Sequence, residues 1–273
     1  MAANNYNGIV DPNGSIHVGS DSLFTVLTAD NFNNLNNQFT GPSLITGNVG
    51  IGGKGNYSMS DGTVDGDFYM NSFGTFSMSG PAKITGHLHG HTNYSGFDGV
   101  DQTSTLANAL ADAQAVSLAA SNLAGTSNYQ VTAGSFHQGG DINISSPANN
   151  VTISGIMNNP FNQPIVLSIN QVNLSNGNFT LAGNANTTFI LNITGKFTIN
   201  NSNLLLTGGL QASHVLFNLL GSNTTSFNLQ QGTQATGVFL AVNRNVDLSG
   251  GKIFGRLVTN QLTITSGGQV ISQ

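Results

Sequence analysis

The chain contains little charge, no cysteine and no glutamate. Of its 273 residues only 6% are charged, against about a quarter in ordinary soluble domains. All eleven acidic residues are aspartates, and the six lysines and arginines are scattered along the chain. Scattered cations and a net charge of −5 exclude the basic stripe that follows a nucleic-acid backbone. We therefore expect no nucleic-acid partner.

The other absences exclude further classes of protein. Without cysteine there are no disulfides, zinc–thiolate sites or thiol nucleophiles. No apolar run approaches the roughly 20 residues of a transmembrane helix, so we expect no insertion into a membrane. The chain also has no Gly-X-Ser-X-Gly elbow and no phosphate-binding loop. We assign no catalytic residue, and we expect a protein that is not an enzyme.

What the chain does contain is one short phrase, repeated from end to end. A few apolar residues alternate with Ser, Thr or Asn, and a Gly or Asn follows. Alternation with period two predicts half-buried strands, and the Gly and Asn predict turns between them. Many such strands with short turns predict a solenoid. Examples lie at residues 56–60, 75–79, 150–154, 197–200, 227–230, 246–249 and 262–265.

One segment departs from this pattern. Residues 103–123 are rich in Ala and Leu, and Leu106, Leu110 and Ala113 fall on one face of a helix. A single helix among so many strands must lie along the solenoid and cover one of its faces. We therefore predict one β-solenoid domain over residues 21–273. Residues 1–20 are predicted to be an N-terminal extension that serves as an assembly or capping strand.

The order of several phrases resembles the microbial ice-binding-protein family, and also the related choice-of-anchor A surface proteins. The resemblance implies an all-β fold with one helix, namely a right-handed three-faced β-solenoid with a long α-helix packed alongside. It also implies a non-enzymatic protein that is secreted or displayed on the cell surface. The phrases lie at residues 23–28, 45–51 and 63–66 before the helix, and at 188–195, 214–218, 237–241 and 255–258 after it.

The resemblance also indicates where a ligand would bind. Family members that bind ice use a flat solenoid face with Thr, Ser, Ala and Asn near the turns, often as Thr-Gly-X-Thr. In the matching phrases here, Lys252 and Gln269 stand in the place of the last Thr. The flat-face binding candidates are Asn201, Asn203, Thr233, Ser249 and Ser266.

Two functions remain open at this point. The first is structural or adhesive: the protein self-assembles into fibres through its ends and its extension, with itself as partner. Asn5, Tyr6 and Ile9 are the assembly candidates, because a short strand can add to a neighbour's open sheet edge. The final strand near residue 271 is expected to leave an edge that must be capped or paired. The second function is ice binding (antifreeze activity), with ice or another extracellular surface as partner.

Two histidines are candidates for binding a divalent metal ion, the one cofactor that we consider. His87 and His89 lie two residues apart, so on a strand both imidazoles share one face and can bind one ion. Asp98 or Asp101 could add a carboxylate. The simpler interpretation is a polar turn that leads toward the helix.

Asp65 and Asp67 form a second candidate, within the acidic cluster at residues 61–67. Carboxylates on a Gly-rich loop suit a hard cation such as Ca²⁺. They could also form the carboxylate pair of a β-helical glycan-active enzyme. The absence of Glu, Trp and a nearby cation weighs against such an enzyme. The simpler interpretation is that Asp forms turns beside Gly.

Overall fold

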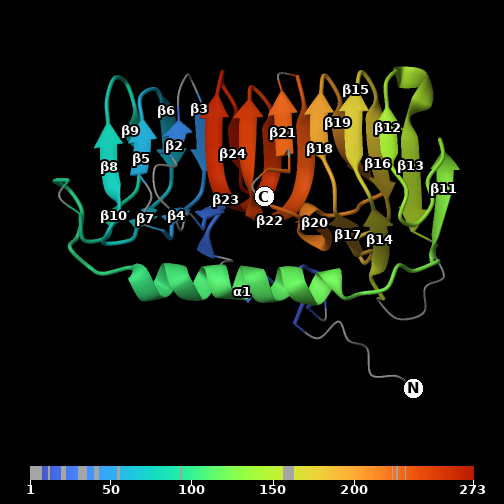
Figure 1. Ribbon diagram of the computed structural model, residues 1–273, viewed down its shortest axis with the longest axis horizontal. Helices are drawn as coiled ribbons and strands as arrows, with labels where there is room; N and C mark the ends of the chain where they lie inside the picture. Colours follow the sequence, from blue (N-terminus) through green and yellow to red (C-terminus); the bar gives the residue numbers. More distant parts are fainter. Residues whose placement is uncertain are drawn as a thin grey trace.

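The computed structural model describes residues 8–11, 13–19, 23–29, 36–39, 43–53, 56–92, 94–155, 163–222, 224–225, 227–230 and 232–273. These residues form a three-faced β-solenoid with one long α-helix, α1 (Thr103–Ser121), running along its length (Figure 1). The predicted fold class is therefore confirmed. Two single-turn 3₁₀-helices, Pro147–Asn149 and Ala212–His214, lie between strands.

Each face is a parallel sheet that receives one strand from every coil. The polar face, named for its outward side chains, consists of β12 (Ile142–Ile144), β15 (Val172–Ser175), β18 (Phe197–Asn200), β21 (Phe227–Gln230), the last residues of β22 (Gln234–Ser249) and β23 (Lys252–Thr265), β2 (Asn36–Phe39), β5 (Asn56–Met59) and β8 (Thr75–Met78).

The second face, called the mixed face, carries both polar and apolar side chains outward. It consists of β13 (Val151–Gly155), β16 (Asn178–Ala182), β19 (Asn203–Thr207), the first residues of β22 and β23, β24 (Gln269–Ile271), β3 (Ser43–Thr46), β6 (Gly62–Asp65) and β9 (Lys83–Ile84). At its outer edge β11 (Tyr129–Ala133) pairs with β13 in the antiparallel direction.

The third face, called the helix face, lies under α1. It consists of β14 (Ile165–Ile169), β17 (Phe189–Ile193), β20 (Val215–Leu219), the middle of β22 and β23, β1 (Val26–Thr28), β4 (Val49–Ile51), β7 (Phe68–Met70) and β10 (Leu88–His89). Every residue of β17 and β20 is buried, as expected of parallel strands that are covered on both sides.

The coils do not stack in chain order. The chain builds one end first, with β1 to β10, and α1 then carries it to the far end, where β11 to β13 begin (Figure 1). The remaining coils stack back toward the middle until β23 pairs with β1 and β2. Strand β24 pairs with β23 on one side and with β3 on the other, Val270 lying opposite both Ile253 and Ile45. The edge that the strand near residue 271 was expected to leave is therefore paired within the chain, on both sides of β24.

The interior of the coils is one continuous apolar core, which includes residues from both ends of the chain. It contains a group of fully buried phenylalanines, of which Phe217 and Phe239 stack with ring centroids 4.7 Å apart. A second apolar layer lies between α1 and the helix face. It includes Leu106, Ala109 and Ala113 of the helix, all completely buried.

The described part of the N-terminal extension folds onto its own chain. Ile9 is completely buried in the layer beneath α1. The backbone N–H of Ile16 donates to the carbonyl of Ser213 (2.7 Å), and the hydroxyl of Thr188 donates to the carbonyl of Gly14 (2.6 Å). The prediction that Ile9 contributes to assembly is therefore corrected, since its side chain already fills the protein's own core. Asn5 and Tyr6 lie outside the described residues.

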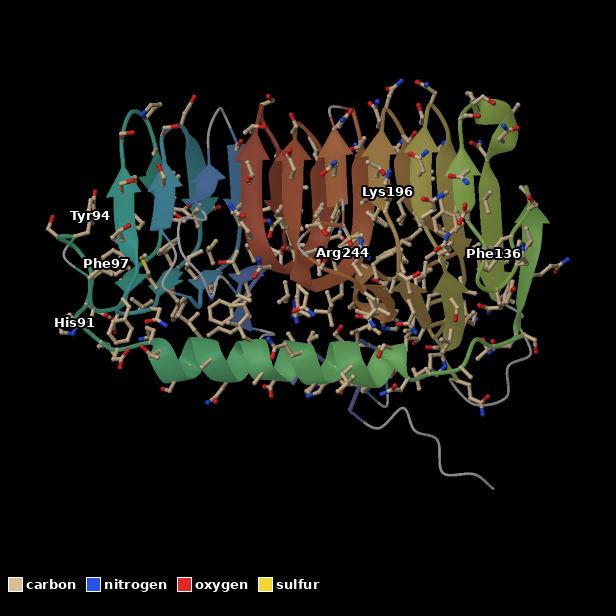
Figure 2. The ribbon with its side chains drawn as sticks, viewed as in Figure 1. His91, Tyr94, Phe97, Phe136, Lys196 and Arg244 are labelled. Carbon is tan, nitrogen blue, oxygen red and sulfur yellow. The ribbon has the colours of Figure 1, made fainter. Side chains whose placement is uncertain are left out.

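Both ends of the solenoid carry a covering segment. At one end Phe97 forms an isolated β-bridge with Leu88. Its ring packs edge-on against that of Phe76, with centroids 5.3 Å apart. At the other end β11 lies outermost, and Tyr129 contacts Phe136 at 5.8 Å. Figure 2 shows Phe97 and Phe136 at these opposite ends. The predicted need for caps is thus met within the chain.

Candidate functional site

The polar face presents two parallel ranks of outward side chains. Strand alternation produces them, because every second residue points away from the core. All but one of these side chains carry an uncharged hydroxyl or amide group, and all are exposed or half-buried. The first rank runs in register through Asn143, Asn173, Thr198, Asn228, Asp247 and Thr263 and continues beyond β2 at Ser58 and Ser77. The second rank contains Ser175, Asn200, Gln230, Ser249 and Thr265.

The turns that follow the second rank extend the same surface. Asn201 and Ser266 sit in these turns with φ of 46° and 54°, the left-handed region that Asn tolerates better than most residues. The amide nitrogen of Asn201 donates to Oδ1 of Asn176 in the next coil (2.7 Å). A shallow hollow of about 550 Å³ lies here, lined by Asn200, Asn201, Gln230, Gly232, Ser249 and Ser266.

The structure thus brings together three of the five flat-face candidates, namely Asn201, Ser249 and Ser266, around one hollow. Asn203 begins β19 on the mixed face, and its side chain is hydrogen-bonded to Oδ1 of Asn178 at 3.3 Å. Thr233 is 1% exposed and donates its hydroxyl to the carbonyl of Gln230 (2.6 Å). The expectation for Thr233 is therefore wrong: this threonine stabilises a turn and does not reach the surface.

The first rank was not identified from the sequence. Its members are the polar residues in the middle of each strand, two positions before those of the second rank. The alternation itself is the signal that would have found them. The turn-proximal Thr-Gly pattern indicates only the edge of the surface.

The mixed face is a less uniform surface. Leu205, Phe254 and Ile271 point outward from β19, β23 and β24 and are half-buried. Lys252 and Lys83 add charges to the adjacent positions. Because charges hold water strongly and interrupt a regular array, the polar face is the more regular of the two uncovered faces.

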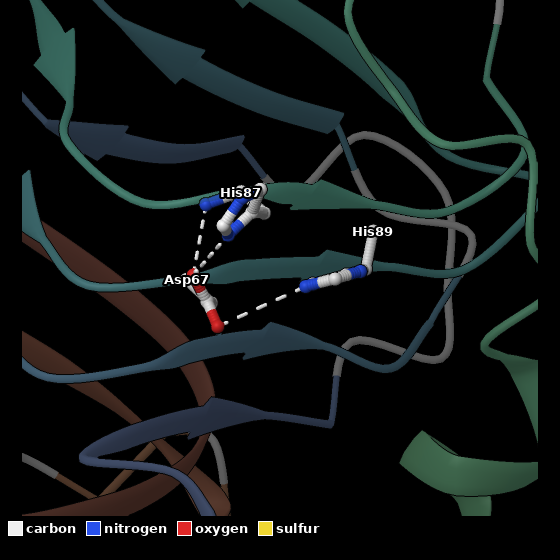
Figure 3. A group of neighbouring side chains, drawn as sticks. All are labelled: Asp67, His87 and His89. Atoms are coloured by element: carbon white, nitrogen blue, oxygen red, sulfur yellow. Dashed lines mark hydrogen bonds and ion pairs between the residues drawn. The ribbon is translucent and has the colours of Figure 1, made fainter.

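The metal candidates lie at the corner between the mixed face and the helix face. Asp67, His87 and His89 come together there (Figure 3). Asp65 does not join them: it lies at the end of β6 and accepts a hydrogen bond from the hydroxyl of Thr85 (2.7 Å). Asp101 is likewise elsewhere, at the start of α1, where it accepts from Thr103. The sequence analysis placed Asp67 and the two histidines in separate candidate sites, whereas the structure brings them together.

Hydrogen bonds to backbone N–H groups lower the pKa of both carboxylates near these histidines. For Asp67 the largest cause is the backbone N–H of His87. For Asp98 the pKa falls to about 2, chiefly because the N–H groups of Val100 and Gly90 donate to it, followed by the ring of His89. Both carboxylates are therefore ionised at neutral pH.

A rigid solenoid with a regular uncovered face defines a class of protein in which the binding element is a surface, not a pocket. The chain matches, over residues 17–271, the family described as "Putative Ice-binding-like adhesive domain". It belongs to that family. No curated protein sequence matches the chain. Within the described part of the chain, no helix is both long and apolar enough to cross a membrane.

Solved structures share the fold. An ice-binding protein from the Antarctic ascomycete Antarctomyces psychrotrophicus is 20% identical with a TM-score of 0.58, covering 95% of this chain and 98% of its own. An ice-binding protein from an Arctic yeast is 16% identical with a TM-score of 0.59, covering 96% of each chain. A third, from an Antarctic bacterium of the Flavobacteriaceae, is 17% identical with a TM-score of 0.54, covering 97% of this chain and 50% of its own. At these identities the likeness concerns the fold.

Proposed function

We propose that this is a non-enzymatic extracellular protein that binds ice through its polar face. The observation that carries the proposal is the pair of in-register ranks on that face. Parallel strands repeat about every 4.8 Å, so hydroxyl and amide groups recur at a fixed spacing along the solenoid. Such an array can hold water molecules in the order of a crystal plane.

The low charge of this face supports the proposal. Of the residues in the two ranks, Asp247 alone is ionisable. Charged groups bind water strongly in their own geometry and would disrupt an ordered layer. The family and the ice-binding neighbours support an ice-binding or adhesive role in general. The regular polar ranks favour ice over an irregular macromolecular partner.

Self-assembly through the ends receives less support from the described residues. Ile9 is buried in its own chain, and β24 is paired on both sides. The described ends carry covering segments. A monomer in solution is therefore the expected state, which light scattering coupled to gel filtration would measure.

Ice recrystallisation inhibition tests the proposed function. Wild-type protein should inhibit recrystallisation at micromolar concentration. Thr198→Tyr, in the first rank, should abolish most of the activity because a bulky ring prevents flat contact, and Ser249→Tyr should do the same in the second rank.

Thr180→Tyr is the matched control, since Thr180 is also an outward threonine, on the mixed face. If Thr180→Tyr loses activity and Thr198→Tyr does not, the mixed face and not the polar face is the binding surface. An inactive wild-type protein would contradict ice binding and leave the adhesive role.

A further inference from the structure

Three metal-ligating side chains from two neighbouring coils meet near the end of the solenoid built by β7 to β10. Strands β7 and β10 pair in parallel with Leu88 opposite Phe68, so His87 follows directly on Asp67 from one coil to the next. His89 lies two residues further and points to the same side of its strand. One ligand atom from each of the three lies within 4.8 Å of the other two.

The distances are near those of a metal site. Nδ1 of His87 lies 3.4 Å from Oδ1 of Asp67, and Nε2 of His89 lies 3.8 Å from Oδ2. Tetrahedral zinc, with bonds of about 2.0 to 2.2 Å, separates its ligand atoms by about 3.3 Å. The His87 side chain is 87% exposed and can rotate, whereas those of Asp67 and His89 are only 32% and 25% exposed. A small movement of the exposed ring therefore completes the site.

His89 is held in the orientation that metal binding requires. Its Nδ1 lies 2.7 Å from Oδ2 of Asp98, and its ring stacks on Tyr69 with centroids 4.5 Å apart. Oδ1 of Asp98 is fixed by the N–H groups of Gly90 (3.1 Å) and Val100 (2.9 Å). A carboxylate on one imidazole nitrogen, with the other nitrogen directed at the ligand cluster, is the usual support of a metal-bound histidine.

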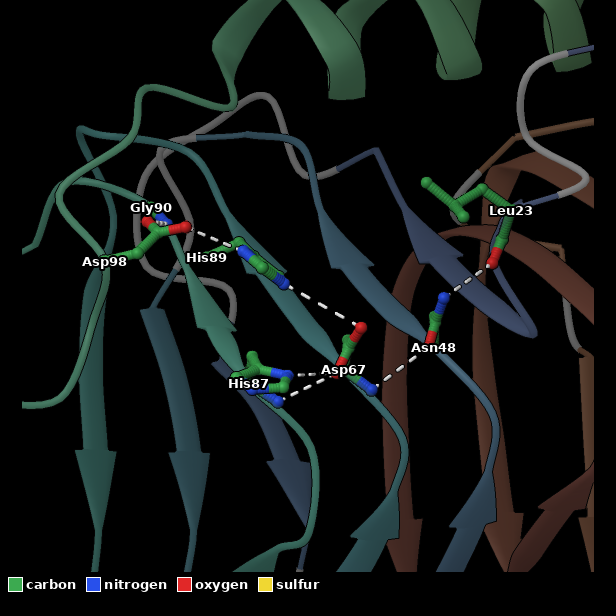
Figure 4. Close-up of polar contacts among 7 residues, drawn as sticks. All are labelled: Leu23, Asn48, Asp67, His87, His89, Gly90 and Asp98. Carbon is green, nitrogen blue, oxygen red and sulfur yellow. Dashed lines mark hydrogen bonds and ion pairs between the residues drawn. The ribbon is translucent and has the colours of Figure 1, made fainter.

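The corner itself does not require this chemistry. One coil earlier, Oδ1 of Asn48 accepts a hydrogen bond from the N–H of Asp67 (3.0 Å), just as Oδ1 of Asp67 accepts one from the N–H of His87 (2.8 Å). Figure 4 shows this succession of equivalent hydrogen bonds. A neutral amide oxygen therefore serves the fold equally well. The carboxylate of Asp67 and the two imidazoles go beyond what the turn needs.

We propose that Asp67, His87 and His89 bind a divalent first-row transition metal ion, with Zn²⁺ as the preferred occupant and Asp98 as a positioning residue. Two imidazole nitrogens and one carboxylate oxygen suit Zn²⁺, Ni²⁺ and Cu²⁺, whereas Ca²⁺ and Mg²⁺ prefer oxygen ligands throughout. A hollow of about 370 Å³, lined in part by His87, His89 and Asp98, leaves the remaining coordination position open to water. The ion would join two coils at the end of the solenoid.

Isothermal titration calorimetry with ZnCl₂, on tag-free protein near neutral pH, tests the site. We expect one Zn²⁺ per chain and a rise in melting temperature when Zn²⁺ is added. Asp67→Asn retains the oxygen that the backbone of His87 needs, so it should fold normally yet lose most of the affinity. His89→Ala should abolish binding, and Asp98→Asn should weaken it by about 10- to 100-fold.

His17→Ala is the matched control. Nδ1 of His17 lies 3.5 Å from Oδ1 of Asp11, an imidazole–carboxylate pair outside the proposed cluster, so this variant should bind Zn²⁺ like wild type. Circular dichroism verifies the fold of every variant. The proposal is overturned if Zn²⁺ does not bind saturably, if Asp67→Asn and His89→Ala bind it undiminished, or if Ca²⁺ binds in preference to Zn²⁺. Because the polar face is separate from this corner, the outcome does not depend on ice binding.

Discussion

At the scale of single residues, two buried asparagines connect the helix to the sheet beneath it. The amide nitrogen of Asn218 donates to Oδ1 of Asn192 (2.8 Å) and to the carbonyl of Ser117 (2.9 Å), while its Oδ1 accepts from the hydroxyl of Ser117 (2.6 Å). Asn192 in turn donates to the carbonyl of Ala120 (2.7 Å). This network fixes the second half of α1 against β17 and β20.

Asn218→Ala should lower the free energy of unfolding by about 2 to 4 kcal/mol, because it leaves buried polar groups of Asn192 and Ser117 without partners. Urea denaturation measures the change. Asn228→Ala, on the half-exposed polar face, is the control and should cost about 0.5 kcal/mol or less. Equal effects of the two substitutions would contradict the role of the network.

Arg244 is the largest fully buried side chain, and Figure 2 shows it inside the solenoid. Its guanidinium donates to the carbonyls of Gly195 (2.8 Å), Ile193 (3.0 Å) and Leu220, which lie at or just after the ends of β17 and β20. Burial lowers the pKa of Arg244 to about 10, so it remains charged at neutral pH.

Arg244→Lys should therefore destabilise the protein by about 2 kcal/mol or more, since one ammonium group cannot reproduce the planar fork that reaches several carbonyls. The midpoint of urea unfolding is the measurement. The control is Arg256→Lys, because Arg256 lies on a strand surface and is half-buried. If Arg244→Lys is as stable as wild type, the planar guanidinium is not needed to satisfy these carbonyls.

These residues also show where inference from the sequence ended. The alternating pattern located the core phenylalanines, because strand period alone decides which residues point inward. In the sequence Arg244 is only one of a few scattered cations. Its burial depends on carbonyl groups from neighbouring coils, which the sequence pattern does not reveal. Asp67 and His87 could have been aligned through the repeated Gly-X-apolar turns at Gly47, Gly66 and Gly86. Asp98 was one of two carboxylates that the sequence placed near the histidines, but it lies in a loop without the repeat, so the sequence could not show that it, and not Asp101, contacts His89.

At the scale of elements, the start of α1 is held by a carboxylate. Oδ1 of Asp101 accepts hydrogen bonds from the hydroxyl of Thr103 (2.6 Å), the hydroxyl of Ser72 (2.7 Å) and the N–H of Thr103 (3.0 Å). These bonds tie the helix to the turn after β7. They also lower the pKa of Asp101 to about 2, with the Thr103 and Ser72 side chains as the largest causes.

A lowered pKa gives this contact a defined pH dependence. Its contribution to stability is fully present above the ordinary aspartate value of 3.8 and is lost as the pH falls toward about 2. Asp101→Asn should therefore be less stable than wild type at pH 7, and the difference should shrink as the pH falls through this window. Urea unfolding at several pH values tests this, with Asp11→Asn as control. A difference that is constant with pH would contradict it.

The helix and most strands were predictable from the sequence, but the long strands β22 and β23 were not. Residues 237–241 and 246–249 were seen as separate phrases. In the structure β22 continues from Gln234 to Ser249 and passes across all three faces. The two-residue alternation indicates which side chains are buried. It does not indicate whether the strand is interrupted where the chain passes from one face to the next.

At the scale of the whole molecule, β23 and β24 join two stacks of coils. Val270 in β24 is completely buried and pairs with a strand from each stack. Val270→Asp should therefore prevent folding of the entire solenoid, because it would place an unpaired charge in the apolar core where the two stacks meet. Val131→Asp, on the outermost strand β11, should be tolerated far better.

Hydrogen exchange gives an independent measurement at the same scale. Amide protons of β1, β3, β23 and β24 should exchange most slowly, and those of β8 to β11 most rapidly, since terminal coils have a neighbour on one side only. If the amide protons at either end of the solenoid exchange most slowly, β23 and β24 are not the stable junction proposed here.

The inserted position of β24 also has a consequence for biosynthesis. The coil that contains β1, β2 and β3 is synthesised long before β23 and β24, the strands that pair with one side of it. The strand edges on that side stay unpaired until β23 and β24 have been synthesised. The two stacks of coils can therefore join only after β24 has left the ribosome.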